Sequence, residues 1–308
     1  MRAGSLLPRE ESRLIAAHYA ALGKYRSILV RGRASISIAP RDAGCGRVAS
    51  RHSVIVVEPG ASLDLKVEVG AARGQMDSSF VELVMGSGSS ANVLVYASPD
   101  AASPAASGLA AAVGDGSRLS YLLMGIGSAM YRQDDRVVLG ASSSLRAGAF
   151  VMSPGGARAD RFLGIDHLGE DSSSYATSVG IALENGYVVV RGIARIKESA
   201  KRSRTSFTAG VALMGEGSRG YAVPMLEVHT GDVVEARHHS FEAKPNEEQL
   251  FYLRSRGLSE SEARSLVVSG MAATQLEVLE GELAEEAKSL LSDLMSRAGL
   301  TALLTPRL

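Results

Sequence analysis

The sequence contains one cysteine, Cys45, and no tryptophan, and aromatic residues make up only 5% of its 308 residues. A single cysteine excludes an intramolecular disulfide, a four-cysteine zinc site and an iron–sulfur cluster ligated by the cysteines of this chain alone. Gly44 and Gly46 flank Cys45, and no second cysteine or lysine-rich segment adjoins it. We therefore interpret Cys45 as a small residue at a corner between strands.

The chain has no excess of positive or negative charge, because its 33 Lys and Arg residues balance 33 Asp and Glu residues. A protein that binds nucleic acid through backbone phosphates usually carries a basic excess, so we expect no nucleic-acid partner. The chain also lacks an apolar run of the roughly 18–20 residues that cross a bilayer. Its first residues lack the apolar core of a signal peptide. These absences predict a soluble, cytoplasmic protein that does not act at a membrane.

Glycine is abundant, with 33 residues, and it separates short β-rich runs from about residue 27 to residue 239. A glycine followed by serine-rich residues and a strand recurs at steps of 28, 28, 24 and 29 residues, at Gly60, Gly88, Gly116, Gly140 and Gly169. A period of this length indicates a solenoid, and coils with two or three short strands fit a parallel β-helix. A two-sheet β-sandwich is punctuated in a similar way and stays an alternative.

A helical pattern precedes the β region. Residues 8–23 repeat apolar side chains at three- and four-residue steps, Pro8 suits the first turn, and Gly23 supplies a stop. We expect an amphipathic helix that packs on a larger body. The patterns divide the chain into an N-terminal helical segment, a β-helix core and a C-terminal helical domain, over residues 1–25, 26–243 and 244–308.

Three helices are predicted after the β region. Asn246 caps the first, the capping box of Ser259 and Glu262 opens the second, and the third covers residues 282–297. The first helix ends at Gly257, which suits a C-terminal stop. We expect these helices to form a bundle that is not part of the β body.

Two polar clusters in the β region are candidates for chemistry. The first contains carboxylates at Asp135, Asp160 and Asp166. Paired carboxylates on neighbouring coils would suit general acid/base catalysis on a polysaccharide. Alternatively, these aspartates cap their own turns. Asp134 adjoins Asp135, but neighbouring residues of a strand face opposite sides, so both cannot enter one cleft.

The second cluster lies between residues 224 and 243 and holds three of the six histidines, among them His238 and His239. Glu227 precedes them. Imidazole and carboxylate are ligand types for iron or zinc, but the spacing matches no compact motif such as H-E-x-x-H. From the residues alone, structural roles and metal ligation both stay open.

The segment 224–271 begins PMLEVHTGD and continues with LFYLRSRGLSESEA. It resembles the C-terminal signature of the SufB/SufD family, in which a P-x-L-E-(I/V) strand leads to a histidine-containing segment, an acidic linker and an (L/I)FYLxSRG helix. Upstream, GYVVVRGIARI from Gly186 and VALMGEGSRGYAVP from Val211 resemble the last β-helix coils of the same family.

The resemblance implies a mainly β protein, a right-handed parallel β-helix with a C-terminal helical domain. It also implies a SufD-like scaffold, not an enzyme, in the SUF system of iron–sulfur cluster assembly. Such a chain would pair through its β-helix, with a SufB-type subunit or with itself as a homodimer, and would dock a SufC-type ABC ATPase. The iron–sulfur cluster would be transient. ATP would be bound by the partner, since this chain has no G-x-x-x-x-G-K-[ST] loop.

The resemblance also implies roles for single residues. The cluster-associated histidine and metal ligand falls at His238, with His239 as the alternative and Glu227 as a further cluster-associated candidate. Ser218 stands about where SufB has a cysteine, and a serine offers no soft thiolate, which implies a SufD-like subunit. Since four apolar residues in a row cannot share one helix face, we expect Tyr252 to be exposed. The implied partner-binding residues are Leu250, Phe251, Tyr252, Arg254, Arg256 and Gly257.

Overall fold

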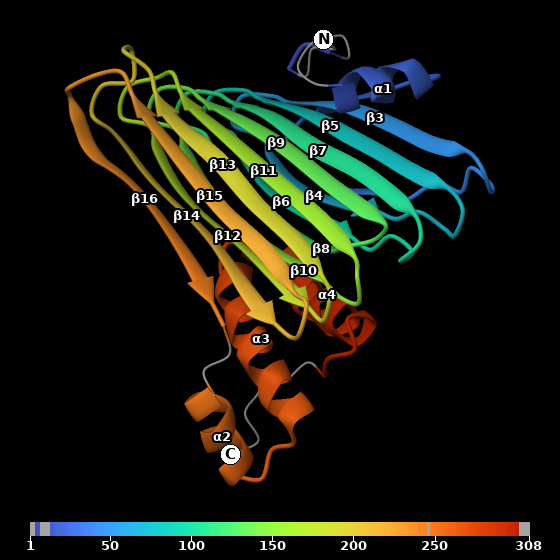
Figure 1. Cartoon of the computed structure of the whole chain (residues 1–308). Coiled ribbons are helices and arrows are strands. Elements are labelled where there is room, and N and C mark those ends of the chain that lie inside the picture. The colour runs from blue at the N-terminus through green and yellow to red at the C-terminus, as the bar shows by residue number, and fades with distance from the viewer. Residues whose placement is uncertain (1–3, 7–12, 245–246, 302–308) are drawn as a thin grey trace.

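The computed structural model describes residues 4–6, 13–244 and 247–301, and its chain winds into successive coils of two strands each (Figure 1). Odd-numbered strands build one eight-stranded sheet, here sheet A, and even-numbered strands build the other, sheet B. Sheet A contains, in spatial order, β1 (Arg26–Val30), β3 (Val48–Val57), β5 (Met76–Met85), β7 (Pro104–Val113), β9 (Met130–Leu139), β11 (Arg158–His167), β13 (Tyr187–Ile196) and β15 (Arg219–Val228).

Sheet B contains, in spatial order, β2 (Arg33–Ile38), β4 (Ser62–Val69), β6 (Ser90–Ala97), β8 (Arg118–Ile126), β10 (Ser144–Ser153), β12 (Ser173–Leu183), β14 (Ser203–Met214) and β16 (Val233–Ala243). Every pairing in both sheets is parallel. Asn92 of β6 hydrogen-bonds to Asp64 of β4, a separation of 28 residues, which is one coil. The all-parallel ladders confirm the predicted β-helix and exclude the sandwich, whose sheets are antiparallel.

Alternation along each strand fills the space between the sheets. On β4, Leu63, Leu65 and Val67 point inward and are buried, while the intervening polar residues point outward. Because the pairing is in register, Val93 and Val95 of β6 continue the same inward rows. Each such side chain contributes about 1.5–3 kcal/mol when it leaves water, so the stacked rows form the main core.

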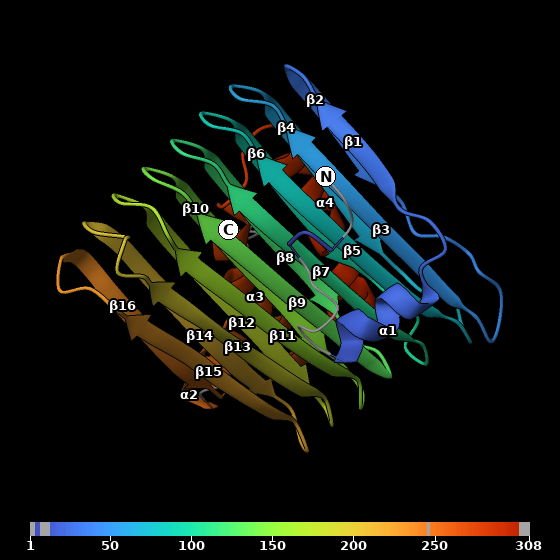
Figure 2. The same cartoon turned by 90° about the horizontal axis from the view of Figure 1, so that it is seen from above.

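The N-terminal helix is present. Helix α1 (Arg13–Ala21) lies on the outer face of sheet A, where Ile15 packs against Phe80 of β5 and Ala110 of β7 (Figure 2). His18 of the same helix is buried. The predicted first turn at Pro8 lies outside the described residues.

The C-terminal helices are α2 (Glu247–Ser255), α3 (Glu260–Leu276) and α4 (Glu282–Arg297). Helices α3 and α4 cover the outer face of sheet B, where Val268 and Leu291 share one hydrophobic core with Leu122, Met124 and Phe150 (Figure 2). The expectation of a separate bundle is therefore wrong. The apolar faces of these two helices pack on the sheet, and only α2 stands away from it (Figure 1).

The local signals at the helix ends are mostly confirmed. Ser259 and Glu262 form the predicted capping box at the start of α3, and α4 has the predicted bounds. The predicted cap of α2, Asn246, lies outside the described residues. Within the described ranges, no helix combines the length and the hydropathy needed to cross a membrane.

Candidate functional site

The last coil leaves an open end on the β-helix. Strands β15 and β16 are the outermost strands of sheets A and B, and no further strand of the described chain pairs with them (Figure 1). Pro224 lies within β15, which suits an edge strand because proline has no N–H to donate. Exposed apolar side chains cluster here, at Tyr221, Val223 and Met225 of β15 and Val234 of β16. Such an edge is a template for pairing with another chain.

His238 and His239 lie on β16, at this open end, and both are exposed. His238 pairs in register with Phe207, which points into the core, whereas His239 pairs with Thr208, which points outward. Since in-register residues of parallel strands share a face, His238 points toward the interior of the open coil and His239 away from it.

Glu227 does not join the histidines. It lies on the outer face of β15, where Arg195 Nε donates to its Oε2 at 3.0 Å and His229 Nε2 lies 3.6 Å from the same oxygen. Within the residues that the structure describes, no three His, Cys, Asp or Glu side chains are grouped closely enough to hold a metal ion. The described residues therefore bring no such group together around His238.

Helix α2 presents the predicted docking residues. Phe251 is 72% exposed and Tyr252 55% exposed, so the expectation of an exposed Tyr252 is confirmed and extends to Phe251. Leu250 and Leu253 are half-buried. Arg256 lies over the Tyr252 ring, 5.2 Å from its centroid. An exposed phenyl and phenol ring side by side are typical of a surface that binds protein.

The helix ends as the sequence predicts. Gly257 has a φ of 94° and its N–H donates to Arg254 O, while Leu258 N–H donates to Leu253 O. These two bonds make a Schellman motif, which needs a residue in the left-handed region and so favours glycine. Gly257 thus shapes the end of α2.

A groove of about 970 Å³ separates α2 from the end of the β-helix. Ser218, which stands near the position of the SufB cysteine, lines it from the turn before β15, and its Oγ donates to Gly215 O at 2.7 Å. Arg254 lines the opposite wall. The other charged side chains of the lining carry both signs, namely Glu216, Lys244, Glu248, Glu260 and Arg264.

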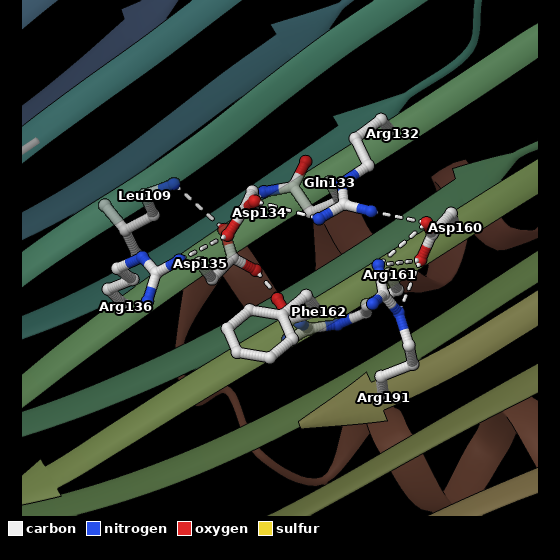
Figure 3. A network of polar contacts seen from close by, with 10 residues as sticks. All are labelled: Leu109, Arg132, Gln133, Asp134, Asp135, Arg136, Asp160, Arg161, Phe162 and Arg191. Carbon is white, nitrogen blue, oxygen red and sulfur yellow. Dashed lines mark hydrogen bonds and ion pairs between the residues drawn. The ribbon is translucent and has the colours of Figure 1, made fainter. Parts of the chain in front are cut away.

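The three carboxylates proposed for polysaccharide chemistry do not share a cleft, and Figure 3 shows two of them, Asp135 and Asp160, with different partners. Asp135 points into the core, Asp160 lies on the outer face of sheet A between Arg132 and Arg191, and Asp166 pairs with Arg195 farther along the same strand. Asp160 and Asp166 are six residues apart on β11, which is roughly 20 Å of extended chain. The structure therefore gives no support to the polysaccharide enzyme.

A buried polar cluster inside the β-helix was missed by the sequence analysis. Tyr121 of β8 donates to Asp135 Oδ2 at 2.6 Å. Leu109 N–H donates to Oδ1 at 2.9 Å, and Arg161 Nη1 lies 3.3 Å from Oδ2 (Figure 3). Gln133 donates to the same carboxylate. Burial raises the pKa of Asp135, although the Arg161 charge acts in the opposite direction. The cluster is sealed within the core.

Comparison with known proteins decides the family. The model described as "SUF system FeS cluster assembly, SufBD core domain" matches residues 40–271. The chain belongs to the SufBD family. SufBD relatives include an iron–sulfur cluster assembly SufBD family protein of Synechocystis sp., 28% identical over 180 residues, and one of Galdieria sulphuraria, 30% identical over 176 residues. The iron–sulfur cluster assembly protein SufB of Bacillus subtilis is 35% identical over 104 residues.

The matches cover different shares of these SufBD proteins. The Synechocystis match takes in 58% of this chain and 37% of the relative, and the Galdieria match 57% and 79%. The match to the Bacillus SufB takes in 34% of this chain and 22% of the relative. The family membership accounts for the β-helix and supports a role in iron–sulfur cluster assembly.

Proposed function

We propose that this chain is a SufD-like, non-enzymatic scaffold subunit of a cytoplasmic SUF complex for iron–sulfur cluster assembly. It pairs through the open end of its β-helix and docks a SufC-type ABC ATPase through α2. The observation that carries the proposal is the exposed pair Phe251 and Tyr252 on a helix that stands away from the β body of a SufBD chain. The absence of a phosphate-binding loop assigns the bound ATP to the partner.

The open end supports the proposed pairing. Strands β15 and β16 offer unpaired backbone groups, and the apolar side chains of Val223, Met225 and Val234 stand beside them in water. A second β-helix, from a SufB-type subunit or a second copy of this chain, would extend both sheets and bury these side chains. That partner would also cover the side of the coil toward which His238 points.

The same geometry supports a proposed position for the cluster, at the open end. The nascent iron–sulfur cluster is cargo, and His238 supplies one imidazole ligand while the paired subunit supplies the rest. The only cysteine of this chain, Cys45, lies in the loop before β3, at the other end of the β-helix from β16. Thiolate ligands must therefore come from the partner, which agrees with a SufD-like subunit that has Ser218 near the SufB cysteine position.

The docking claim is tested by co-purification. Phe251→Ala combined with Tyr252→Ala removes both exposed rings of α2, and we expect at least a tenfold loss of affinity for a SufC-type ATPase, since two aromatic contacts of about 1–2 kcal/mol each are lost. The measurement is a pull-down of the ATPase with the full-length chain, followed by titration. A circular dichroism spectrum checks that the β-helix stays folded.

Tyr25→Ala is the matched control, because Tyr25 is also exposed but lies beside β1 at the far end of the molecule. It should bind the ATPase like the unmodified chain. Equal binding by the double variant of α2 would refute docking through this helix while leaving family membership untouched.

A further inference from the structure

A second groove, of about 720 Å³, crosses the first residues of strands β9, β11, β13 and β15 on the outer face of sheet A. Its volume lies within the range of small-molecule sites. Figure 1 shows these strands side by side, and Figure 2 shows that α1 lies farther along the same sheet, over β3 and β5. This groove shares no lining residue with the groove beside α2, but the two adjoin, because Gly217 and Arg219 of this groove flank Ser218 of the other.

Three residues stand in one row across the groove. Arg158 of β11 pairs in register with Tyr187 of β13, and Tyr187 pairs with Arg219 of β15. In-register residues of parallel strands share a face, and neighbouring strands lie about 4.8 Å apart, so the backbones of the two arginines are about 10 Å apart with the tyrosine between them. Both arginine side chains are exposed.

These two arginines have no acidic partner. Neither has an ion pair or a side-chain hydrogen bond to another residue in the described ranges. The one carboxylate in the groove, Asp160, is already held by Arg132 and by a bidentate contact from Arg191, as Figure 3 shows. It therefore does not neutralise Arg158 or Arg219, and the groove has an excess of positive charge.

Glycines line the groove at the corners before its strands. Gly156, Gly186 and Gly217 form the corners that precede β11, β13 and β15, and all three line the groove. A Cβ on Gly186 would lie 1.8 Å from Ser153 O, so only glycine fits that corner. Apart from Asn185, the corner residues that line the groove place no side chain between a ligand and the row of Arg158, Tyr187 and Arg219.

We propose that this groove binds a small diphosphate or polyphosphate anion, held by Arg158 and Arg219 on either side of Tyr187. Guanidinium groups match phosphate oxygens in a bidentate way, and two of them flanking a ring favour a ligand with more than one anionic group. The balance of 33 basic and 33 acidic residues over the chain disfavours a polynucleotide. The proposal does not depend on the scaffold function.

Isothermal titration of the full chain with inorganic pyrophosphate, at constant ionic strength, tests the proposal. We expect saturable binding of one pyrophosphate per chain. Arg158→Gln and Arg219→Gln should each weaken it by about tenfold or more, because each removes a charge-assisted contact. Arg158→Lys should recover only part of the affinity, since lysine keeps the charge without the bidentate geometry.

Arg118→Gln is the matched control, because Arg118 follows a Gly-Ser corner as Arg219 does, is exposed, and lies on sheet B. It should leave binding unchanged. No saturable binding by the unmodified chain, or an equal loss in the Arg118 variant, would overturn the proposal. A parallel titration with ADP identifies the source of the anion: tighter binding that Tyr187→Ala abolishes indicates a nucleotide, and equal binding indicates the inorganic ion. Both results support the site.

Discussion

At the scale of residues, a buried chain of polar contacts joins α1 to sheet A. His18 Nδ1 lies 2.8 Å from Ser78 Oγ, and His18 Nε2 lies 3.1 Å from His52 Nδ1. His52 Nε2 lies 2.8 Å from Glu82 Oε1, and the N–H of Leu6 donates to the other oxygen of this carboxylate. The N-terminal segment is thus attached to β3 and β5 through ionisable groups.

These contacts make the attachment sensitive to acid. Burial, reinforced by the nearby His52, lowers the pKa of His18 to about 3 from its ordinary 6.5. Burial alone would raise the pKa of Glu82, but hydrogen bonds from His52 and from backbone N–H groups lower it overall. A histidine with a lowered pKa contributes stability that is complete above pH 6.5 and is lost as the pH falls toward 3. The glutamate loses its contribution below its unfolded pKa.

We predict that the free energy of opening of α1 falls by about 2 kcal/mol between pH 7 and pH 5. The reason is that His18 becomes protonated over this range when α1 is open, whereas it stays neutral when α1 is packed on the sheet. Hydrogen exchange of the α1 amides, corrected for the intrinsic rate, measures this change. His18→Gln, which does not titrate, should remove most of the pH dependence, and α3 should show none. Equal pH dependence in the variant would contradict the assignment.

The polar core cluster shows what a careful sequence analysis could have found. Along β11, Ala159, Arg161, Leu163 and Ile165 share one parity, so Arg161 belongs to an inward row. The same parity on β9 places Asp135 inward. The alternation along the strands therefore predicts that Arg161 and Asp135 point inward, although charged side chains usually face solvent. Only the fold shows that these two side chains meet.

At the scale of elements, the glycine repeat was predictable from the sequence. The reason for each corner glycine was predictable only in part. Gly60, Gly88 and Gly116 have φ values of 71°, 67° and 65°, the left-handed conformation that glycine adopts readily. Gly140 and Gly169 do not, and they are glycines because a Cβ would strike a neighbouring corner. Both reasons select glycine, so the sequence pattern cannot tell them apart.

The packing of the C-terminal helices could not be predicted from the sequence. An apolar stripe on a helix has the same period whether it meets another helix or a sheet. The outward residues of β8 and β10 are apolar, as at Leu122, Met124 and Phe150. Since a sheet face exposed to water is usually polar, these residues indicate that another element covers sheet B. The exposure of Tyr252 on α2, by contrast, was predictable from its run of consecutive apolar residues.

At the open edge, charge should block pairing. Val223→Lys combined with Met225→Lys places two charges among the exposed apolar side chains of β15, and burying them in an interface would cost several kcal/mol. We predict loss of the homodimer, or of the pair with a SufB-type subunit, in light-scattering mass measurements. Tyr175→Lys, on an interior strand of sheet B, should have no effect. An unchanged mass for the double variant would exclude this edge as the interface.

At the scale of the whole molecule, the helices and the open end occupy different parts of the β-helix. The open end and α2 lie at the C-terminal coil, α1 covers the outer face of sheet A near the other end, and α3 and α4 cover sheet B (Figures 1 and 2). A partner β-helix can therefore meet β15 and β16 while an ATPase contacts α2. Both contacts then lie at the C-terminal end of the β-helix, whose last strand carries His238, the proposed cargo ligand.

Iron retained by the assembled complex tests the central claim most directly. The chain is co-expressed with SufB- and SufC-type partners under anaerobic conditions, purified without oxygen, and analysed for iron and acid-labile sulfide per complex of verified mass. We predict that the intact complex carries both, and that His238→Ala lowers them several-fold without changing the mass. An intact complex with no iron above the level of the isolated chain would contradict the scaffold function.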